Sequence, residues 1–305
     1  KDNMINNKFK SGFVSIIGRP NVGKSTLINQ LVGEKIAIMS DKPQTTRNQI
    51  KAIYNDDEAQ IVFVDTPGMQ DPRNKLGRYM LKSSEESMKG MDIILYVVDE
   101  SDFIGKSDSK IIEKLRSRRD TKLLIINKVD KINNEKLMKI VQMYSELNLF
   151  DEIIPVSALK GTNSGKIIEV LKKYLTYGPK FFPEDMITDQ PERVLVSEII
   201  REKILHYTDE EIPHGTMVRI ESMKKRTDKD IIDISAVIYC ERENHKSIII
   251  GKGGRKIKGI GSAARKELEE KLGIKVNLEL WVKPKENWRD NENYIKGFGF
   301  NEKEL

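Results

Sequence analysis

The chain has 305 residues, 33% of them charged, and a formal net charge of +6 at pH 7. This length is enough for about two domains, each with its own core. A single cysteine, Cys240, excludes a disulfide framework and favours a reducing compartment. Because we find no long apolar run and no signal-peptide pattern, we expect a soluble cytoplasmic protein. Peripheral contact with the inner face of the cell membrane stays open.

Up to about Gly178 the sequence alternates short apolar runs with longer amphipathic ones. This alternation predicts a mostly parallel sheet flanked by helices. The predicted strands are 13–18, 49–54, 61–64, 92–99, 123–126 and 153–156. The predicted helices are 24–33, 76–89, 107–116, 135–147 and 165–174.

The segment from Gly18 to Ser25, GRPNVGKS, fits the GxxxxGK[ST] pattern of a phosphate-binding loop between a strand and a helix. Its glycines let the backbone curl so that N–H groups and the helix N-terminus face a phosphate. Lys24 is expected to reach the β and γ phosphates, and the Ser25 hydroxyl to bind Mg²⁺. A glycine-rich turn with a solvated lysine is the alternative. The residues predicted to bind nucleotide here are Gly18, Asn21, Val22, Gly23, Lys24, Ser25 and Thr26.

A second motif, DTPG, follows the strand 61–64. Asp65 therefore lies at the carboxyl edge of the sheet, where nucleotide sites form in open α/β folds. We expect Asp65 to hold Mg²⁺ through water and the Gly68 N–H to sense the γ-phosphate.

The NKVD motif after the strand 123–126 predicts guanine rather than adenine. The Asp130 carboxylate can accept from the two adjacent donors on guanine, the N1–H and the 2-amino group, and adenine offers no such pair. Lys128 can lie over the base, and the Ala158 N–H can donate to the guanine oxygen. GTP and GDP are thus the expected ligands. The predicted guanine site comprises Asn127, Lys128, Asp130, Ser157 and Ala158.

Three prolines between residues 179 and 191 predict a linker. We therefore predict a GTP-binding domain over 1–178 and a second domain, with a C-terminal tail, over 192–305. The second domain has a predicted helix at 193–206, strands at 217–221, 231–240 and 275–282, and a basic helix before the last strand. With a further helix at 247–250, the order is α-β-β-α-α-β.

The motif GKGG, from Gly251 to Gly254, fits the GxxG loop of a KH module and precedes an amphipathic helix. Residues 245–275 carry nine Lys or Arg against three Glu, a local charge of +6. Such a loop can hold a nucleic-acid backbone while single-stranded RNA bases lie in the adjacent groove. Pattern alone predicts a strand at 247–250, whereas a KH module makes it helical, and we follow the module. The predicted RNA-binding residues are Gly251, Lys252, Gly253, Gly254, Arg255, Lys256 and Lys258.

The chain resembles the Era family, bacterial ribosome-associated GTPases with a type II KH domain. The resemblance spans nearly the whole sequence: GRPNVGKSTLIN, PQTTR, DTPG, NKVD and SALKG in the first half, and IPHG, IIGKGGRKIKGIG and ENWRDNENYIKGFGF in the second. It implies an α/β P-loop GTPase domain followed by a smaller α+β KH domain. It also implies a monomeric assembly factor of the small ribosomal subunit whose KH domain binds the 3′ end of 16S rRNA under the control of GTP.

The resemblance assigns Thr46 of PQTTR to the Mg²⁺ that accompanies the γ-phosphate, so the expected metal ligands are Ser25, Thr46 and Asp65. Met69 stands where many small GTPases carry a water-positioning glutamine, so catalysis must use another device. In similar potassium-stimulated GTPases an asparagine at the position of Asn21 helps bind a monovalent cation, which makes K⁺ a candidate cofactor. Alternatively, Asn21 only shapes the loop. The predicted catalytic residues are Lys24, Thr46, Gly68 and Asn21.

The second domain could hold a protein partner, with GxxG as a plain turn, or the chain could be a metabolic P-loop NTPase. In the polar tail, Trp288 and Tyr294 could stack on unpaired bases or pin the tail to the KH domain.

Overall fold

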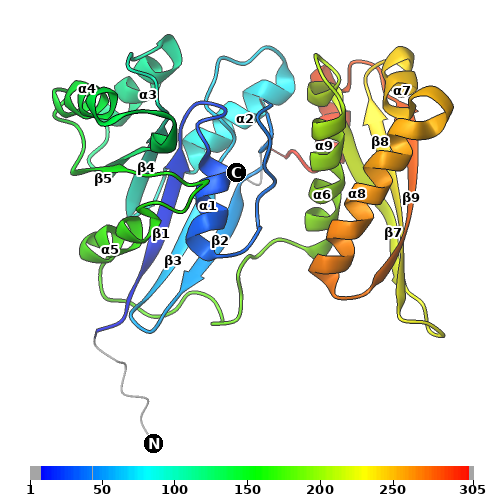
Figure 1. Ribbon diagram of the computed structural model, residues 1–305, viewed down its shortest axis with the longest axis horizontal. Coiled ribbons are helices and arrows are strands. Elements are labelled where there is room, and N and C mark those ends of the chain that lie inside the picture. Colours follow the sequence, from blue (N-terminus) through cyan, green and yellow to red (C-terminus); the bar gives the residue numbers. More distant parts are fainter. Residues whose placement is uncertain (1–7, 43, 302–305) are drawn as a thin grey trace, which may run out of the picture.

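The computed structural model describes residues 8–42 and 44–301. Figure 1 shows two α/β bodies side by side, with a six-stranded sheet in the first and a three-stranded sheet in the second. The predicted fold class, an α/β P-loop domain followed by a smaller α+β domain, is confirmed. No helix of the described residues is long and apolar enough to cross a membrane.

The first sheet has the order β2-β3-β1-β4-β5-β6, and only β2 runs antiparallel to its neighbour. β3 and β4 are buried along their whole length, which explains why they read as continuous apolar runs rather than alternating ones. The strands are β1 (Lys10–Ile17), β2 (Ile50–Asn55), β3 (Ala59–Asp65), β4 (Ile93–Val98), β5 (Thr121–Ile126) and β6 (Glu152–Pro155).

Helices cover both faces of this sheet. One face packs against α1 (Lys24–Val32) and α5 (Ser164–Tyr174), and the other against α3 (Lys106–Arg116) and α4 (Asn134–Ser145). A further helix, α2 (Lys75–Glu86), follows the DTPG motif. Because β1, β3, β5 and β6 are parallel, the loops after them meet at one edge of the sheet, and these loops carry the predicted nucleotide motifs.

The second domain has the predicted α-β-β-α-α-β order, and its helices pack on one face of the sheet β7-β8-β9. Residues 247–250 are helical, as the KH module implied, and the buried residues of this helix, His245 and Ile249, are four positions apart, as on one helical face. β7 continues beyond the predicted end at 221, since pairing with β8 resumes after a bulge. The elements are α6 (Glu192–Tyr207), β7 (Met217–Lys225), β8 (Ile231–Cys240), α7 (Glu243–Ile250), α8 (Arg255–Leu272) and β9 (Lys275–Pro284).

The segment predicted as a linker is docked on the first domain. The Ile53 N–H donates to the Ile187 carbonyl at 2.9 Å, and the Gln60 side chain accepts from the backbone of Phe181 at 2.6 Å. These contacts hold the connection along the edge of the sheet. The exact domain limits remain a prediction, and their ends, 1–7 and 302–305, lie outside the described residues.

The C-terminal tail crosses back to the first domain. Trp288 is fully buried in a cluster with Leu76 and Tyr79 of α2, and its Nε1 donates to the Gly215 carbonyl at 2.8 Å. Stacking of Trp288 on RNA bases is therefore wrong for this arrangement, since its ring has no free face. Tyr294 is half-buried beneath Lys285, whose Nζ lies 4.3 Å from the ring centroid. The tail thus pins the two domains together.

Candidate nucleotide site and RNA groove

The phosphate-binding loop is held by the guanine motif. Asn127 Nδ2 donates to the Val22 carbonyl at 2.9 Å, and Lys128 Nζ donates to the Asn21 carbonyl at 2.6 Å. Gly23 has φ 97°, and a Cβ there would lie 2.2 Å from Asn127 Nδ2. Only glycine therefore allows this close approach. The phosphate-binding loop and the NKVD motif are therefore tied into one unit.

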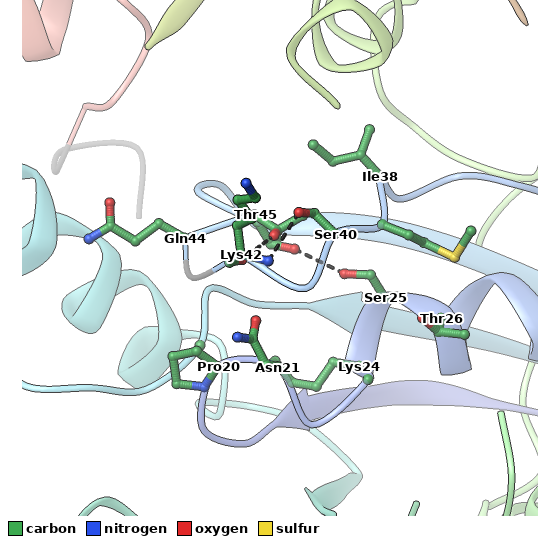
Figure 2. Close-up of a pocket in the computed structure, with 14 residues that line it drawn as sticks. Pro20, Asn21, Lys24, Ser25, Thr26, Ile38, Ser40, Lys42, Gln44 and Thr45 are labelled. Atoms are coloured by element: carbon green, nitrogen blue, oxygen red, sulfur yellow. Dashed lines mark hydrogen bonds between the residues drawn. The ribbon is translucent and has the colours of Figure 1, made fainter. Parts of the chain in front are cut away.

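Three predicted metal ligands converge beside α1. Ser25 Oγ lies 3.0 Å from Thr46 Oγ1 and donates to Asp65 Oδ2 at 3.0 Å, while Thr46 Oγ1 lies 3.5 Å from the same carboxylate. Figure 2 shows Lys24 and Ser25 on one side of the pocket, facing Ser40, Lys42 and Thr45 on the other. A carboxylate and two hydroxyls are hard oxygen donors, so this set fits Mg²⁺.

Burial changes the charge behaviour of the two ionisable groups in this pocket. Burial raises the pKa of Asp65 to about 6, although Lys24 and the hydrogen bond from Ser25 oppose the shift. Burial lowers the pKa of Lys24 to about 8, against the opposing attraction of Asp65. Lys24 Nζ donates to the Arg19 carbonyl at 3.0 Å. A bound Mg²⁺ would favour the charged form of Asp65, and a bound phosphate would favour the charged form of Lys24.

We expect the affinity for nucleotide with Mg²⁺ to be highest between pH 6 and pH 8. It should fall as the pH drops through about 6, because protonated Asp65 no longer attracts the cation, and as the pH rises through about 8, because neutral Lys24 no longer attracts phosphate. Titration with fluorescent GDP across pH 5 to 9 measures both limbs. EDTA and, separately, Asp65→Asn should leave only the smaller acid limb that protonation of the GDP phosphate itself causes. An acid limb of wild-type size in both would contradict the assignment.

The segment after β3 lies against the phosphate-binding loop. The Met69 N–H donates to the Gly18 carbonyl at 2.9 Å, and a Cβ on Gly68 would lie 2.8 Å from Pro20 Cα. Met69 itself is 3% exposed and packs in the core. Its side chain is buried and has no group that could position a water molecule as a glutamine would. The structure therefore places no water-positioning side chain at residue 69.

The structure brings the residues of the guanine motif together. Asp130 Oδ1 accepts from Ser157 Oγ at 2.6 Å, which fixes the orientation of the carboxylate. The Ala158 N–H, predicted to donate to the guanine oxygen, donates instead to Asn127 Oδ1 at 2.9 Å. Its contact with the base therefore remains a prediction, as do the roles of the other site residues.

One residue of the loop escaped the sequence analysis. Arg19 forms ion pairs with Asp99 and, at 3.1 Å, with Asp108, whose other oxygen accepts from Tyr96 at 2.6 Å. This network anchors the outer edge of the loop and turns the guanidinium away from the phosphate-binding face. Nothing in the local sequence signals it, because the partners follow β4, about 80 residues later.

The GKGG motif forms an exposed loop between α7 and α8. Gly251, Gly253 and Gly254 all have positive φ, and Lys252 is exposed at the tip. Arg255 Nε donates to the Lys252 carbonyl at 3.2 Å. The predicted basic residues Lys256 and Lys258 follow on the first turn of α8.

A groove of about 320 Å³ runs beside this loop, between α8 and β9. Of the residues that line it, Lys258 is among those predicted to bind RNA, and Ser262, Arg265 and Asn277 are not. The helical members could have been found, since 258, 262 and 265 lie on one helical face. The groove residues are Ile257, Lys258, Gly261, Ser262, Arg265, Asn277, Leu278 and Leu280.

These two sites, on this fold, define a P-loop GTPase with a C-terminal KH domain. A family model described as "50S ribosome-binding GTPase" matches residues 13–128, and one described as "KH domain" matches residues 211–289. GTPase Era of Clostridioides difficile strain 630 is 61% identical over 296 residues, which cover 97% of this chain and 100% of that protein. GTPase Era of Alkaliphilus oremlandii is 58% identical over 292 residues, 96% of this chain and 99% of that protein. The chain belongs to the Era family of GTPases.

Solved structures agree with this placement. A crystal structure of Era in complex with MgGDPNP and nucleotides 1506–1542 of 16S ribosomal RNA has a TM-score of 0.92 and 41% identity, covering 96% of this chain and 99% of that one. A variant of Aquifex aeolicus Era bound to GDP and AlF₄⁻ has a TM-score of 0.93 and 40% identity, with the same coverage.

Proposed function

We propose that this chain binds and hydrolyses GTP with Mg²⁺, and that its nucleotide state controls binding of the 3′ end of 16S rRNA during assembly of the small ribosomal subunit. The observation that carries the proposal is the convergence of Ser25, Thr46 and Asp65 within 3.0–3.5 Å beside the phosphate-binding loop. Thr46 belongs to the segment that a γ-phosphate would order, so this cluster would differ between the GTP and GDP states.

The chain's own groups account for much of the chemistry. Lys24 neutralises phosphate charge, and the Gly68 N–H, close to the phosphate-binding loop, holds the terminal phosphate. Ser25, Thr46 and Asp65 would hold Mg²⁺, which when bound offsets the negative charge of the β and γ phosphates. With Met69 in the glutamine position, hydrolysis by the protein alone should be slow.

The RNA part of the proposal rests on the exposed GKGG loop and its adjoining groove. The groove's apolar floor suits the faces of unpaired bases, and Lys258 and Arg265 at its rim suit phosphates. A related Era with 16S rRNA nucleotides bound supports this choice over a protein partner. We expect a cytoplasmic monomer, and peripheral membrane contact remains a prediction.

Crosslinking of RNA to the protein in cell lysate, followed by sequencing, tests the proposal. With GTP present, fragments from the 3′ end of 16S rRNA should be enriched over the sample with GDP. Crosslinks spread evenly over unrelated RNAs, or identical in GTP and GDP, would contradict it. Capture of protein alone would favour the interpretation in which the second domain binds a protein.

We further propose that K⁺, bound in part by the Asn21 side chain, places positive charge beside the phosphates where an arginine finger would otherwise act. Potassium should accelerate single-turnover hydrolysis about tenfold over sodium, a gain of about 1.4 kcal/mol in transition-state stabilisation. Asn21 has φ 64°, so alanine there would add backbone strain. Asn21→Gly is the sharper variant, because it removes the amide and keeps the turn. Equal wild-type rates in the two salts would exclude this role.

A further inference from the structure

The segment that carries Thr46 is held by the second domain. On α6, Arg201 is 1% exposed and forms a two-point ion pair with Glu198, at 2.9 and 2.7 Å. The same guanidinium donates to the Thr45 carbonyl and, at 3.4 Å, to the Gln44 carbonyl. These two carbonyls immediately precede Thr46.

The residue after Thr46 is inserted into the second domain. Arg47 is 3% exposed, and it donates to the Thr216 carbonyl at 2.6 Å and to the His214 carbonyl at 2.9 Å. Its guanidinium lies 5.7 Å from the ring centroid of Trp288. Thr46 is therefore held on both sides. The carbonyls before it accept from Arg201 of the second domain, and Arg47 after it bonds to the second domain and lies beside Trp288 of the tail.

A third contact holds the start of the same segment. Glu202, the neighbour of Arg201 on α6, accepts from the Met39 N–H at 2.8 Å and from Lys35 Nζ at 2.7 Å. Figure 1 shows α6 on the side of the second domain that faces the first. One helix, α6, thus contacts Met39, Gln44 and Thr45.

The segment needs such support. Between α1 and β2 it has no helix or strand among its described residues, and Gln44 is in the left-handed region with φ 61°, which costs free energy for a residue other than glycine. A loop without internal structure samples many conformations unless other elements order it. Here the ordering groups come from beyond residue 190, on the other domain.

We propose that Arg201 is a positioning residue for GTP hydrolysis, supplied by the second domain, which holds the Thr46 hydroxyl against Ser25 and Asp65. The inference rests on the role proposed above for Thr46. It means that the GTPase site is incomplete without α6. An RNA that shifts α6 would therefore change the affinity for GTP. Because coupling between two binding sites is reciprocal, bound GTP would change the affinity for that RNA by the same factor.

The test compares Arg201→Gln and Arg201→Lys with Arg193→Gln, a matched change at an exposed arginine on the same helix. Affinities for GDP and for the non-hydrolysable analogue GDPNP are measured with Mg²⁺, together with single-turnover hydrolysis. Arg201→Gln should weaken GDPNP binding and slow hydrolysis about tenfold each, with GDP affinity unchanged, because only the triphosphate engages Thr46. Arg201→Lys, which keeps one donor, should recover part of both losses, and Arg193→Gln should match wild type.

Thr46→Ala separates this inference from the function on which it rests. If Thr46→Ala weakens GDPNP binding relative to GDP binding and Arg201→Gln does not, the positioning role is overturned and the proposed function stands. If neither variant weakens GDPNP binding relative to GDP binding, the proposed role of Thr46 is overturned as well. Equal loss of GDP and GDPNP affinity in both Arg201 variants, with a lower melting temperature, would show that Arg201 serves only the fold and would also overturn the inference.

Discussion

Asp130→Asn is expected to weaken GTP binding about 30-fold, equivalent to about 2 kcal/mol, and to improve binding of xanthosine triphosphate. Ser157 Oγ donates to Asp130 Oδ1 at 2.6 Å and orients the carboxylate at the end of the guanine motif. An asparagine amide would place a donor against a guanine donor. Xanthine carries a carbonyl in place of the 2-amino group, so it would accept from that amide. Titration with fluorescent GTP and XTP measures both changes.

The matched control is Glu135→Gln, which removes the same charge from an exposed carboxylate in the first turn of α4. It should bind both nucleotides as the wild type does. Circular dichroism and the melting temperature check that the Asp130 variant is folded. Unchanged GTP affinity and no gain for XTP in Asp130→Asn would remove this carboxylate from the base site.

The nucleotide half of the molecule could be predicted because its information is local. Each strand is a short apolar run, and each motif follows directly at its carboxyl end, so a parallel sheet brings the motifs together without further assumptions. Lys24, Ser25 and Asp65 needed only this rule. Thr46 needed the family resemblance, since no strand precedes it and its segment has no regular structure of its own.

The joint between the domains could not be predicted in this way. Arg201 and Glu202 sit within a helix whose position was predicted, but charged residues on a helix usually face solvent. Here α6 is covered on one side by its own domain and on the other by Met39, Gln44 and Thr45, so both side chains are buried. Arg201 also has a local partner, Glu198, but the partners of Arg201 and Glu202 in the first domain are about 160 residues away in the chain, beyond the reach of any local pattern.

The tail illustrates the same limit. Trp288 stands in a polar stretch, which made contact with RNA plausible, yet it packs against α2 and beneath Arg47. An aromatic side chain in a polar segment can anchor that segment to another domain as readily as it can bind a base. In this chain it links the helix after the DTPG motif to Arg47, the residue that follows Thr46.

The double variant Lys252→Asp with Gly253→Asp is expected to lower RNA affinity about 100-fold while GTP binding persists. Both residues are exposed at the tip of the GKGG loop, where two carboxylates would face the RNA backbone. Gly253 has φ 62° and no neighbouring atom within 4 Å of an added Cβ, and aspartate is among the residues that best tolerate this backbone region. The loop should therefore keep its shape. Filter binding of a single-stranded oligonucleotide with the sequence of the 16S rRNA 3′ end measures the loss.

The control places the same change of charge elsewhere on the domain. Thr227→Asp with Lys229→Asp lies in the exposed turn between β7 and β8 and also lowers the net charge by three units. If RNA affinity depended on the overall charge of the domain, both double variants would weaken binding equally. Loss in the GKGG variant alone, with fluorescent-GTP affinity intact, assigns the backbone contact to this loop. Full RNA affinity in the GKGG variant would show that RNA binds at another surface, and would contradict the assignment of the KH groove as the RNA site.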